Sequence, residues 1–137
     1  HDFTAMDSDG KIGDPAVGGT VRQMGNNIPD GWSGLDIGPG SAALFGEIIQ
    51  ESKTVLWNGP MGVFEDTRFS AGTKHVAQSM AENKASFTVI GGGDSAAAAK
   101  EFKFDTEIDH VSTGGGASLE LIEKGTLPGI DALLMNH

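Results

Sequence analysis

Two glycine triplets in this sequence stand between an apolar, strand-like run and a helix-like run. Gly91–Gly93 follow "TVI" and lead into Asp94 and Ser95, whereas Gly114–Gly116 follow "HVST" and lead into "ASLELIEK". A third apolar run, "TVLW", ends in Asn58–Pro60. Glycine permits a positive φ and a close approach of the backbone to a ligand. The first turn of a helix adds unpaired N–H groups at the positive end of its dipole. We therefore predict turns that bind phosphate groups without lysine.

Two acidic residues near these turns could take part in the same chemistry. Asp94 would repel a bare phosphate, but it suits a site in which Mg²⁺ lies between the carboxylate and the phosphate oxygens. Ser95 could cap the following helix or donate to a phosphate oxygen. Glu65, at the end of "NGPMGVFE", could accept hydrogen bonds from ribose hydroxyls. The competing interpretations are tight strand-to-helix turns with Asp94 as an ordinary N-cap, and Glu65 as a solvated loop carboxylate.

Composition excludes several classes of protein. The chain has 137 residues, with 19 acidic against 9 basic side chains and a formal net charge of −10. That balance argues against a nucleic-acid groove and against an anionic membrane surface as partners. The sequence contains no cysteine, which excludes disulfides and cysteine-based zinc sites. No apolar run approaches the ~18 residues of a membrane span. We expect a soluble, cytoplasmic protein.

The order of predicted elements indicates the fold class. Residues 1–30 are irregular and loop-rich, although "DFTAM" and "TVRQM" could be short strands, and the segment 28–41 is again rich in turn residues. From Ser41, a candidate N-cap, helices and strands alternate. The predicted helices are 42–53, 71–83, 94–102 and 117–124, and the predicted strands are 54–57, 86–90 and 110–113. This alternation predicts about four parallel strands in a Rossmann-like, three-layer α/β/α fold, with helices on both faces of a mainly parallel sheet. Ligands of such sheets bind beyond the carboxyl ends of the strands.

Several longer motifs resemble the phosphoglycerate kinase family, in its C-terminal nucleotide-binding domain. They are "WNGPMGVFE" (57–65), "IGGGDSAAA" (90–98), "HVSTGGGASLELIE" (110–123) and "LPGIDAL" (127–133), preceded by "IPDGWSGLDIGPGS" (28–41). The resemblance covers about 31–133, while residues 5–27 match no motif of the family. It implies that 1–137 is a partial C-terminal domain, incomplete relative to the family's own, with a loop-rich segment 1–30 and an α/β core 31–133.

The resemblance also implies an activity and a set of site residues. The activity is the glycolytic, reversible transfer of a phosphoryl group from 1,3-bisphosphoglycerate to Mg-ADP, which gives 3-phosphoglycerate and ATP. The implied positions are Gly34 and Leu35 at the adenine; Pro60, Gly62 and Val63 at the base and ribose, with Asn58 nearby; Glu65 at the ribose hydroxyls; Gly92, Gly93, Asp94 and Ser95 at the phosphates, with Asp94 towards the metal; and Gly114, Gly115 and Gly116 at the transferring group.

Departures from the family pattern limit what we expect of this chain. The family chain is much longer, and its basic phosphoglycerate-binding domain and phosphate-contacting lysines have no counterpart here. Gly40 stands where the family usually has a larger residue, and Lys124 and Gly125 stand where it usually reads Gly-Lys. Because the chain also starts at His1 rather than Met, we expect a fragment that is inactive alone but keeps weak nucleotide affinity. One alternative is a truncated, non-catalytic nucleotide-binding module, and another is a structural or interaction half that needs the missing segment as a partner. The complete enzyme is expected to be a monomer.

Overall fold

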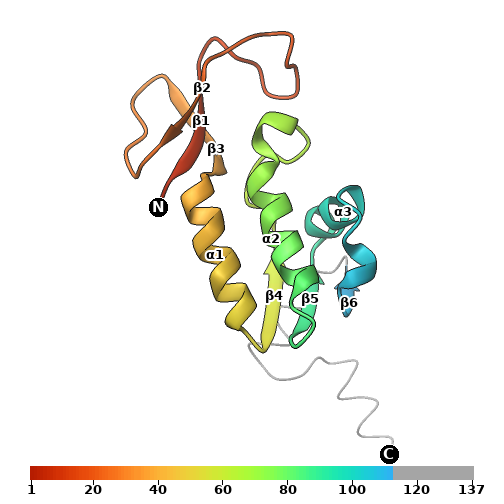
Figure 1. Ribbon diagram of the computed structural model, residues 1–137. Helices are drawn as coiled ribbons and strands as arrows, with labels where there is room; N and C mark the ends of the chain where they lie inside the picture. The colour runs from red at the N-terminus through yellow and green to blue at the C-terminus, as the bar shows by residue number, and fades with distance from the viewer. Residues whose placement is uncertain (113–137) are drawn as a thin grey trace, which may run out of the picture.

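The computed structural model describes residues 1–112, which form two three-stranded sheets and three α-helices (Figure 1). The predicted helix 117–124, the triplet Gly114–Gly116 and the segment 127–133 lie outside the described residues. In chain order the elements are β1 (Phe3–Asp7), β2 (Val21–Met24), β3 (Trp32–Ile37), α1 (Pro39–Glu51), β4 (Thr54–Asn58), the 3₁₀ turn η1 (Thr67–Phe69), α2 (Ala71–Glu82), β5 (Phe87–Gly91), α3 (Gly93–Glu101), the 3₁₀ turn η2 (Asp105–Glu107) and β6 (His110–Ser112).

The first sheet is antiparallel, with strand order β2-β1-β3. It confirms the two short strands predicted near the amino terminus. The prediction of a turn-rich segment over 28–41 is wrong for residues 32–37, which form β3. Trp32 pairs with Asp7, and Ser33 pairs with Met6. Because the strand is stabilised by this distant partner, the nearby glycines, which are typical of turns, hide it from local sequence patterns.

Helix α1 begins three residues earlier than predicted. Its N-cap is Gly38 and its first residue is Pro39, so the assignment of Ser41 as N-cap is wrong. Proline is favoured at the first helical position because its missing N–H needs no partner there. The carboxylate of Asp2 accepts hydrogen bonds from the backbone N–H groups of Gly40 (2.9 Å) and Ser41 (2.5 Å). A side chain from the amino terminus therefore supplies the cap that Ser41 was expected to give.

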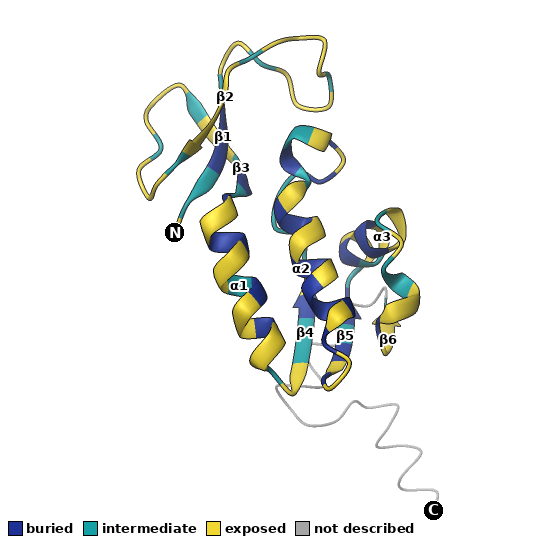
Figure 2. Cartoon of the chain, in the orientation of Figure 1, coloured by how far each residue is buried: buried dark blue, intermediate teal, exposed yellow. Residues whose placement is uncertain are grey.

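The second sheet is parallel, with strand order β4-β5-β6, and confirms the Rossmann-like α/β class. It contains three strands within residues 1–112, against the expected four. Helices α1, α2 and α3 lie on one face of it, where Ile49, Met80 and Ala98 pack with Trp57 and Ile90 in one buried cluster (Figure 2). A second helical layer is not present among residues 1–112.

The buried cluster also contains Trp57 and Phe64, so both side chains belong to the core rather than to a base-stacking surface. Strand residues that point to the other face are less buried, and Phe87 remains 56% exposed. No helix within residues 1–112 combines the length and apolar character that crossing a membrane requires.

The carboxyl end of α1 is closed by the side chain of Asn83, which follows α2. Its amide nitrogen lies 2.8 Å from the carbonyl oxygen of Ile49, 3.0 Å from that of Ser52 and 3.3 Å from that of Gln50. These carbonyls belong to the last turn of a helix, where no intrahelical N–H is available. One buried side chain thus connects the carboxyl end of α1 to the end of α2.

We expect Asn83→Ala to lower the free energy of unfolding of the chain by about 1–3 kcal/mol, because buried carbonyl oxygens lose their donor. Denaturant titration followed by circular dichroism measures the loss. The matched control is Gln78→Ala on the same helix, whose exposed amide donates only to Glu82. Equal losses for the two variants would contradict this role of Asn83.

Candidate functional site

The three parallel strands end side by side at one edge of the sheet. Asn58 at the end of β4 is paired in register with Gly91 of β5, and Gly91 is paired with Ser112 of β6. The first glycine triplet and the "NGP" turn therefore begin next to each other at this edge. The second triplet follows Ser112 directly in the sequence, outside the described residues.

Two turns at this edge depend on glycine. Gly59 has a φ of 109° and Gly92 a φ of 98°, values that side chains with a Cβ rarely adopt. Gly92 donates its backbone N–H to the carbonyl of Ser112 at 2.9 Å and is the N-cap of α3. No side chain caps this helix, so the N–H groups of its first turn are not used by a capping side chain.

Ser95 lies in the first turn of α3, and its side chain points into the fold. Its side chain is fully buried, and its Oγ accepts the backbone N–H of Gly59 at 2.6 Å. The indole Nε1 of Trp57 donates to the carbonyl of Gly59 at 2.5 Å. Ser95 is not the N-cap, one of the two roles that the sequence left open. Its hydroxyl joins the turn after β4 to the first turn of α3.

Asp94 is exposed in the first turn of α3 and makes no hydrogen bond or ion pair within residues 1–112. It is therefore not the ordinary N-cap of that helix. No group of three acidic or histidine side chains within the described residues could hold a metal ion. Asp94 fits Mg²⁺ only as a single protein carboxylate, with phosphate oxygens and water completing the shell, which is a common arrangement for this cation.

A second part of the site brings β3 beside the loop after β4. The backbone N–H of Val63 donates to the carbonyl of Leu35 at 2.9 Å. A Cβ on Gly62 would lie 2.5 Å from that same carbonyl oxygen, so only glycine fits there. Leu35 is thus adjacent to Gly62 and Val63, and Gly34 precedes it in β3. Asn58 and Pro60 precede them in the same loop and link this part to the strand ends.

Glu65 is exposed between two buried neighbours, Phe64 and Asp66. Phe64 packs edge-on against Phe102, with ring centroids 6.3 Å apart. The carboxylate of Glu65 makes no hydrogen bond or ion pair with any residue from 1 to 112. It is therefore available to a ligand on this part of the surface.

Asp36 is a site residue that sequence reasoning missed. Its side chain is buried at the end of β3, where it accepts the N–H groups of Gly72 (2.8 Å) and Ile37 (2.9 Å). Gly62 and Gly72 both pack so closely against it that a Cβ on either would collide with its Oδ1. Burial raises the pKa of the Asp36 carboxyl, and the two N–H groups oppose that rise. The sequence around Asp36, which precedes "IGP", contains no local pattern that indicates a buried carboxylate bonded to a distant helix.

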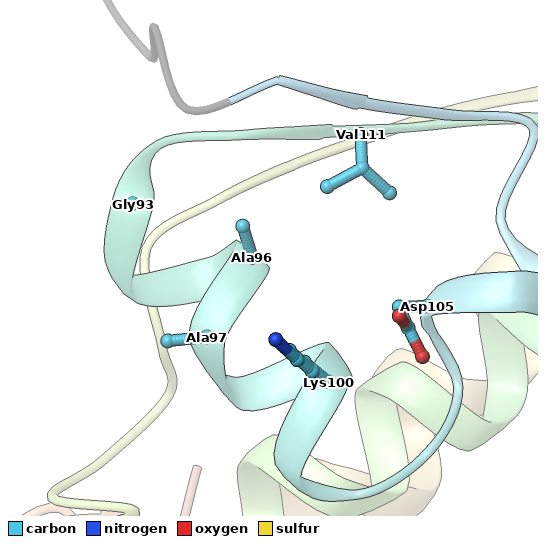
Figure 3. A pocket seen from close by; sticks show the side chains of 6 residues that line it. All are labelled: Gly93, Ala96, Ala97, Lys100, Asp105 and Val111. Carbon is cyan, nitrogen blue, oxygen red and sulfur yellow. The ribbon is translucent and has the colours of Figure 1, made fainter.

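A cavity of about 440 Å³ opens between α3 and β6, and it adjoins the first turn of α3 at Gly93 (Figure 3). Small side chains of α3 form its floor, while the side chains of Lys100 and Asp105 lie at its far end. The cavity was not predicted because three separate segments enclose it. Its lining residues are Gly93, Ala96, Ala97, Lys100, Asp105 and Val111.

Comparison with known sequences identifies relatives of one kind. The sequence model of the phosphoglycerate kinase family matches residues 5–125. A phosphoglycerate kinase of Trichodesmium erythraeum is 56% identical over 106 residues, which cover 77% of this chain and 27% of that protein. One of Clostridium novyi is 57% identical over 107 residues, covering 78% of this chain and 27% of that protein. The chain therefore spans about a quarter of the length of these relatives.

Solved structures give the same result. A phosphoglycerate kinase from Coxiella burnetii superposes with a TM-score of 0.80 at 34% identity, covering 95% of this chain and 32% of that one. One from Pyrococcus horikoshii superposes with a TM-score of 0.73 at 32% identity, covering 97% of this chain and 31% of that one. The family match includes residues 5–27, which the sequence motifs had left out, and it ends before residues 127–133.

The buried position of Asp36 predicts a pH dependence of stability. Its pKa is raised on folding above the ordinary value of 3.8, so the protonated form favours the fold. The stabilisation by the protonated Asp36 carboxyl is complete below the pKa that this group has in the unfolded chain. It is lost as the pH rises through the pKa that the group has in the folded chain. We expect the free energy of unfolding of the wild type to fall, relative to Asp36→Asn, as the pH rises above the ordinary carboxyl pKa of 3.8.

Denaturant titrations at a series of pH values measure the difference. The comparison uses the slope with pH, because Asn also loses one hydrogen bond and shifts the whole curve. Asp30→Asn, on an exposed loop, is the control and should keep the wild-type slope. Parallel curves for the wild type and Asp36→Asn would refute the prediction.

Proposed function

The chain belongs to the phosphoglycerate kinase family, and on that basis we propose that it carries part of the nucleotide site of a glycolytic kinase. The reaction is the reversible transfer of a phosphoryl group from 1,3-bisphosphoglycerate to Mg-ADP, giving 3-phosphoglycerate and ATP. The observation that supports this most is the edge of the parallel sheet. There three strand ends lie in register, and two left-handed glycine turns sit beside the uncapped first turn of α3.

The phosphates of the nucleotide would be held at that edge by backbone groups. Phosphoryl transfer requires positioning and neutralisation of charge more than covalent chemistry by the protein. The N–H groups of Gly93 and its neighbours and the dipole of α3 offer both without a cation. Ser95 would keep the turn in place through its bond to Gly59, and its backbone N–H would face the phosphates, since its side chain is fully buried. Asp94 would hold Mg²⁺, which neutralises charge on the phosphate oxygens when bound.

The base and ribose would lie along the joint between β3 and the loop after β4. Leu35, Gly62 and Val63 are already in contact there. Gly34, Asn58 and Pro60 complete this wall, as the family resemblance implies. Glu65 would accept hydrogen bonds from the ribose hydroxyls, since its carboxylate has no partner within residues 1–112. Asp36 would not touch the nucleotide but would hold the wall in shape from behind.

The residues that would act on the transferring phosphoryl group lie beyond the described residues. Gly114, Gly115 and Gly116 would present their N–H groups to the transferring phosphoryl group. The phosphoglycerate would be bound by parts of the family's chain that this sequence does not match. The net charge of −10 is consistent with a cytoplasmic enzyme that binds neither nucleic acid nor membranes. We expect the complete enzyme to be a monomer.

Calorimetry with Mg-ADP tests the proposed site. The wild-type chain should bind weakly, and Asp94→Ala and Glu65→Ala should each lower the affinity about tenfold, as loss of a charged hydrogen-bonding partner does. Chelating Mg²⁺ with EDTA should remove the effect of Asp94→Ala but leave that of Glu65→Ala. The control is Glu82→Ala at the end of α2, which should bind like the wild type. Equal heats for all four proteins would exclude this site.

A second prediction concerns turnover. We expect the purified chain alone to give no measurable ATP synthesis from 1,3-bisphosphoglycerate and ADP in a coupled assay, because it spans about a quarter of its relatives. Addition of a recombinant piece that covers the rest of a relative's chain should restore activity. Normal turnover by the chain alone would refute the expectation. Nucleotide binding without rescue would favour a non-catalytic binding fragment.

A further inference from the structure

A buried ion pair next to Glu65 joins two segments that are far apart in the sequence. The carboxylate of Asp66 is fully buried and accepts from the side chain of Arg68, with Nη2 at 2.6 Å and Nε at 3.0 Å. It also accepts the backbone N–H groups of Arg68 (3.1 Å) and Gly13 (2.9 Å). The guanidinium of Arg68 reaches further and donates from Nη2 to the carbonyl of Lys11 at 2.8 Å. We call Asp66 and Arg68, with their bonds to residues 11–13, the loop latch.

The latch holds the long connection between β1 and β2. Within residues 8–19 the other hydrogen bonds are local, and they form a tight turn in which Lys11 pairs with Asp14 and Gly13 has a φ of 79°. Among the described residues, the hydrogen bonds that connect 8–19 to anything outside its own hairpin go to Asp66 and Arg68. Figure 1 shows this connection reaching over to the segment that precedes α2. Without the latch, no hydrogen bond would keep it there.

The same two residues fix the turn that presents Glu65. Asp66 donates its backbone N–H to the carbonyl of Val63 at 3.0 Å and accepts from the N–H of Phe69 at 2.8 Å. Arg68 packs over the ring of Phe69, which is fully buried, with its guanidinium carbon 5.4 Å from the centroid. The exposed Glu65 therefore stands between a core residue, Phe64, and a fully bonded one, Asp66.

The charge pattern makes this pair unusual in the molecule. The only other ion pair within residues 1–112 joins Lys84 and Glu107, and it is exposed. A buried pair gains little net stability, because removing both charges from water offsets their attraction. Its geometry, however, specifies one arrangement of the groups around it, since a bidentate guanidinium–carboxylate pair tolerates few others. Placed beside a ligand residue, such a pair serves positioning more than stability.

We propose that Asp66 is a positioning residue of the nucleotide site, which, with Arg68, latches residues 8–19 against the turn of Glu65 and holds the Glu65 carboxylate ready for the ribose hydroxyls. This inference rests on the proposed nucleotide function of Glu65. It adds a residue that touches no ligand itself and a loop, residues 8–19, that is held beside the turn of Glu65. The ligand class that it concerns is a nucleotide with free ribose hydroxyls.

Two readouts on the full chain test the proposal. The first is limited trypsin cleavage after Lys11, which should be about tenfold faster in Asp66→Asn than in the wild type, because the loop loses its anchors. The second is the preference for Mg-ADP over its 2′,3′-dideoxy analogue in calorimetry. The wild type should prefer Mg-ADP, and Asp66→Asn should lose most of that preference, as Glu65→Ala does. A merely structural residue would not change this ratio.

Matched variants keep the outcomes separate. Glu107→Gln breaks the exposed ion pair and should match the wild type in both readouts. Arg68→Lys keeps the charge but loses the fork that reaches Lys11, so it should give an intermediate result even if Asp66→Asn fails to fold. A preference for Mg-ADP that survives unchanged in both latch variants, with faster cleavage after Lys11, would overturn the positioning role alone. Absence of any Mg-ADP binding by the wild type would overturn the proposed function and this role with it. An unchanged rate of cleavage after Lys11 in the latch variants would overturn the loop latch.

Discussion

Helix ends leave backbone groups without intrahelical partners, and at three helix ends of this protein side chains that are distant in the sequence bind these groups. Asp2 accepts from the first turn of α1, Asn83 donates to its last turn, and Asp36 accepts from the first turn of α2. An unpaired N–H or C=O in these places would cost more than an ordinary hydrogen bond contributes. Because each partner comes from another element, closing the helix ends also fixes how the elements pack together.

This constraint explains why the antiparallel sheet stands beside the carboxyl edge of the parallel sheet. Asp36 ends β3 and binds the start of α2, while its neighbour Leu35 accepts from Val63 in the loop between β4 and α2. The two glycines at 62 and 72 let the backbone come close enough for both contacts. A site that uses β3, the loop after β4 and the first turn of α3 therefore needs both sheets.

The low number of cations shapes the electrostatics of the whole chain. With 9 basic against 19 acidic side chains, most carboxylates cannot form ion pairs. Asp2 and Asp36 are stabilised by backbone N–H groups instead. Within residues 1–112 the buried Asp66 alone forms an ion pair with an arginine, Arg68, which holds the pKa of the Asp66 carboxyl well below the usual range. The edge of the parallel sheet offers phosphates the same kind of partner, because backbone N–H groups and a helix dipole attract an anion without competing with nearby acids.

The sequence by itself determined the features that depend on neighbouring residues. Apolar runs and helix-like spacing placed β4, β5, β6 and their helices, and the glycines after β4 and β5 marked the left-handed turns, because φ and local periodicity are properties of short segments. The tertiary structure alone decided β3, the capping of α1, and the roles of Ser95, Asp36 and Asp66. Each of these rests on a contact between segments far apart in the chain, such as 36 residues for Ser95 with Gly59 and 53 for Asp66 with Gly13. Local patterns contain no signal of such contacts, because the partner of a buried polar group is set by how the elements pack.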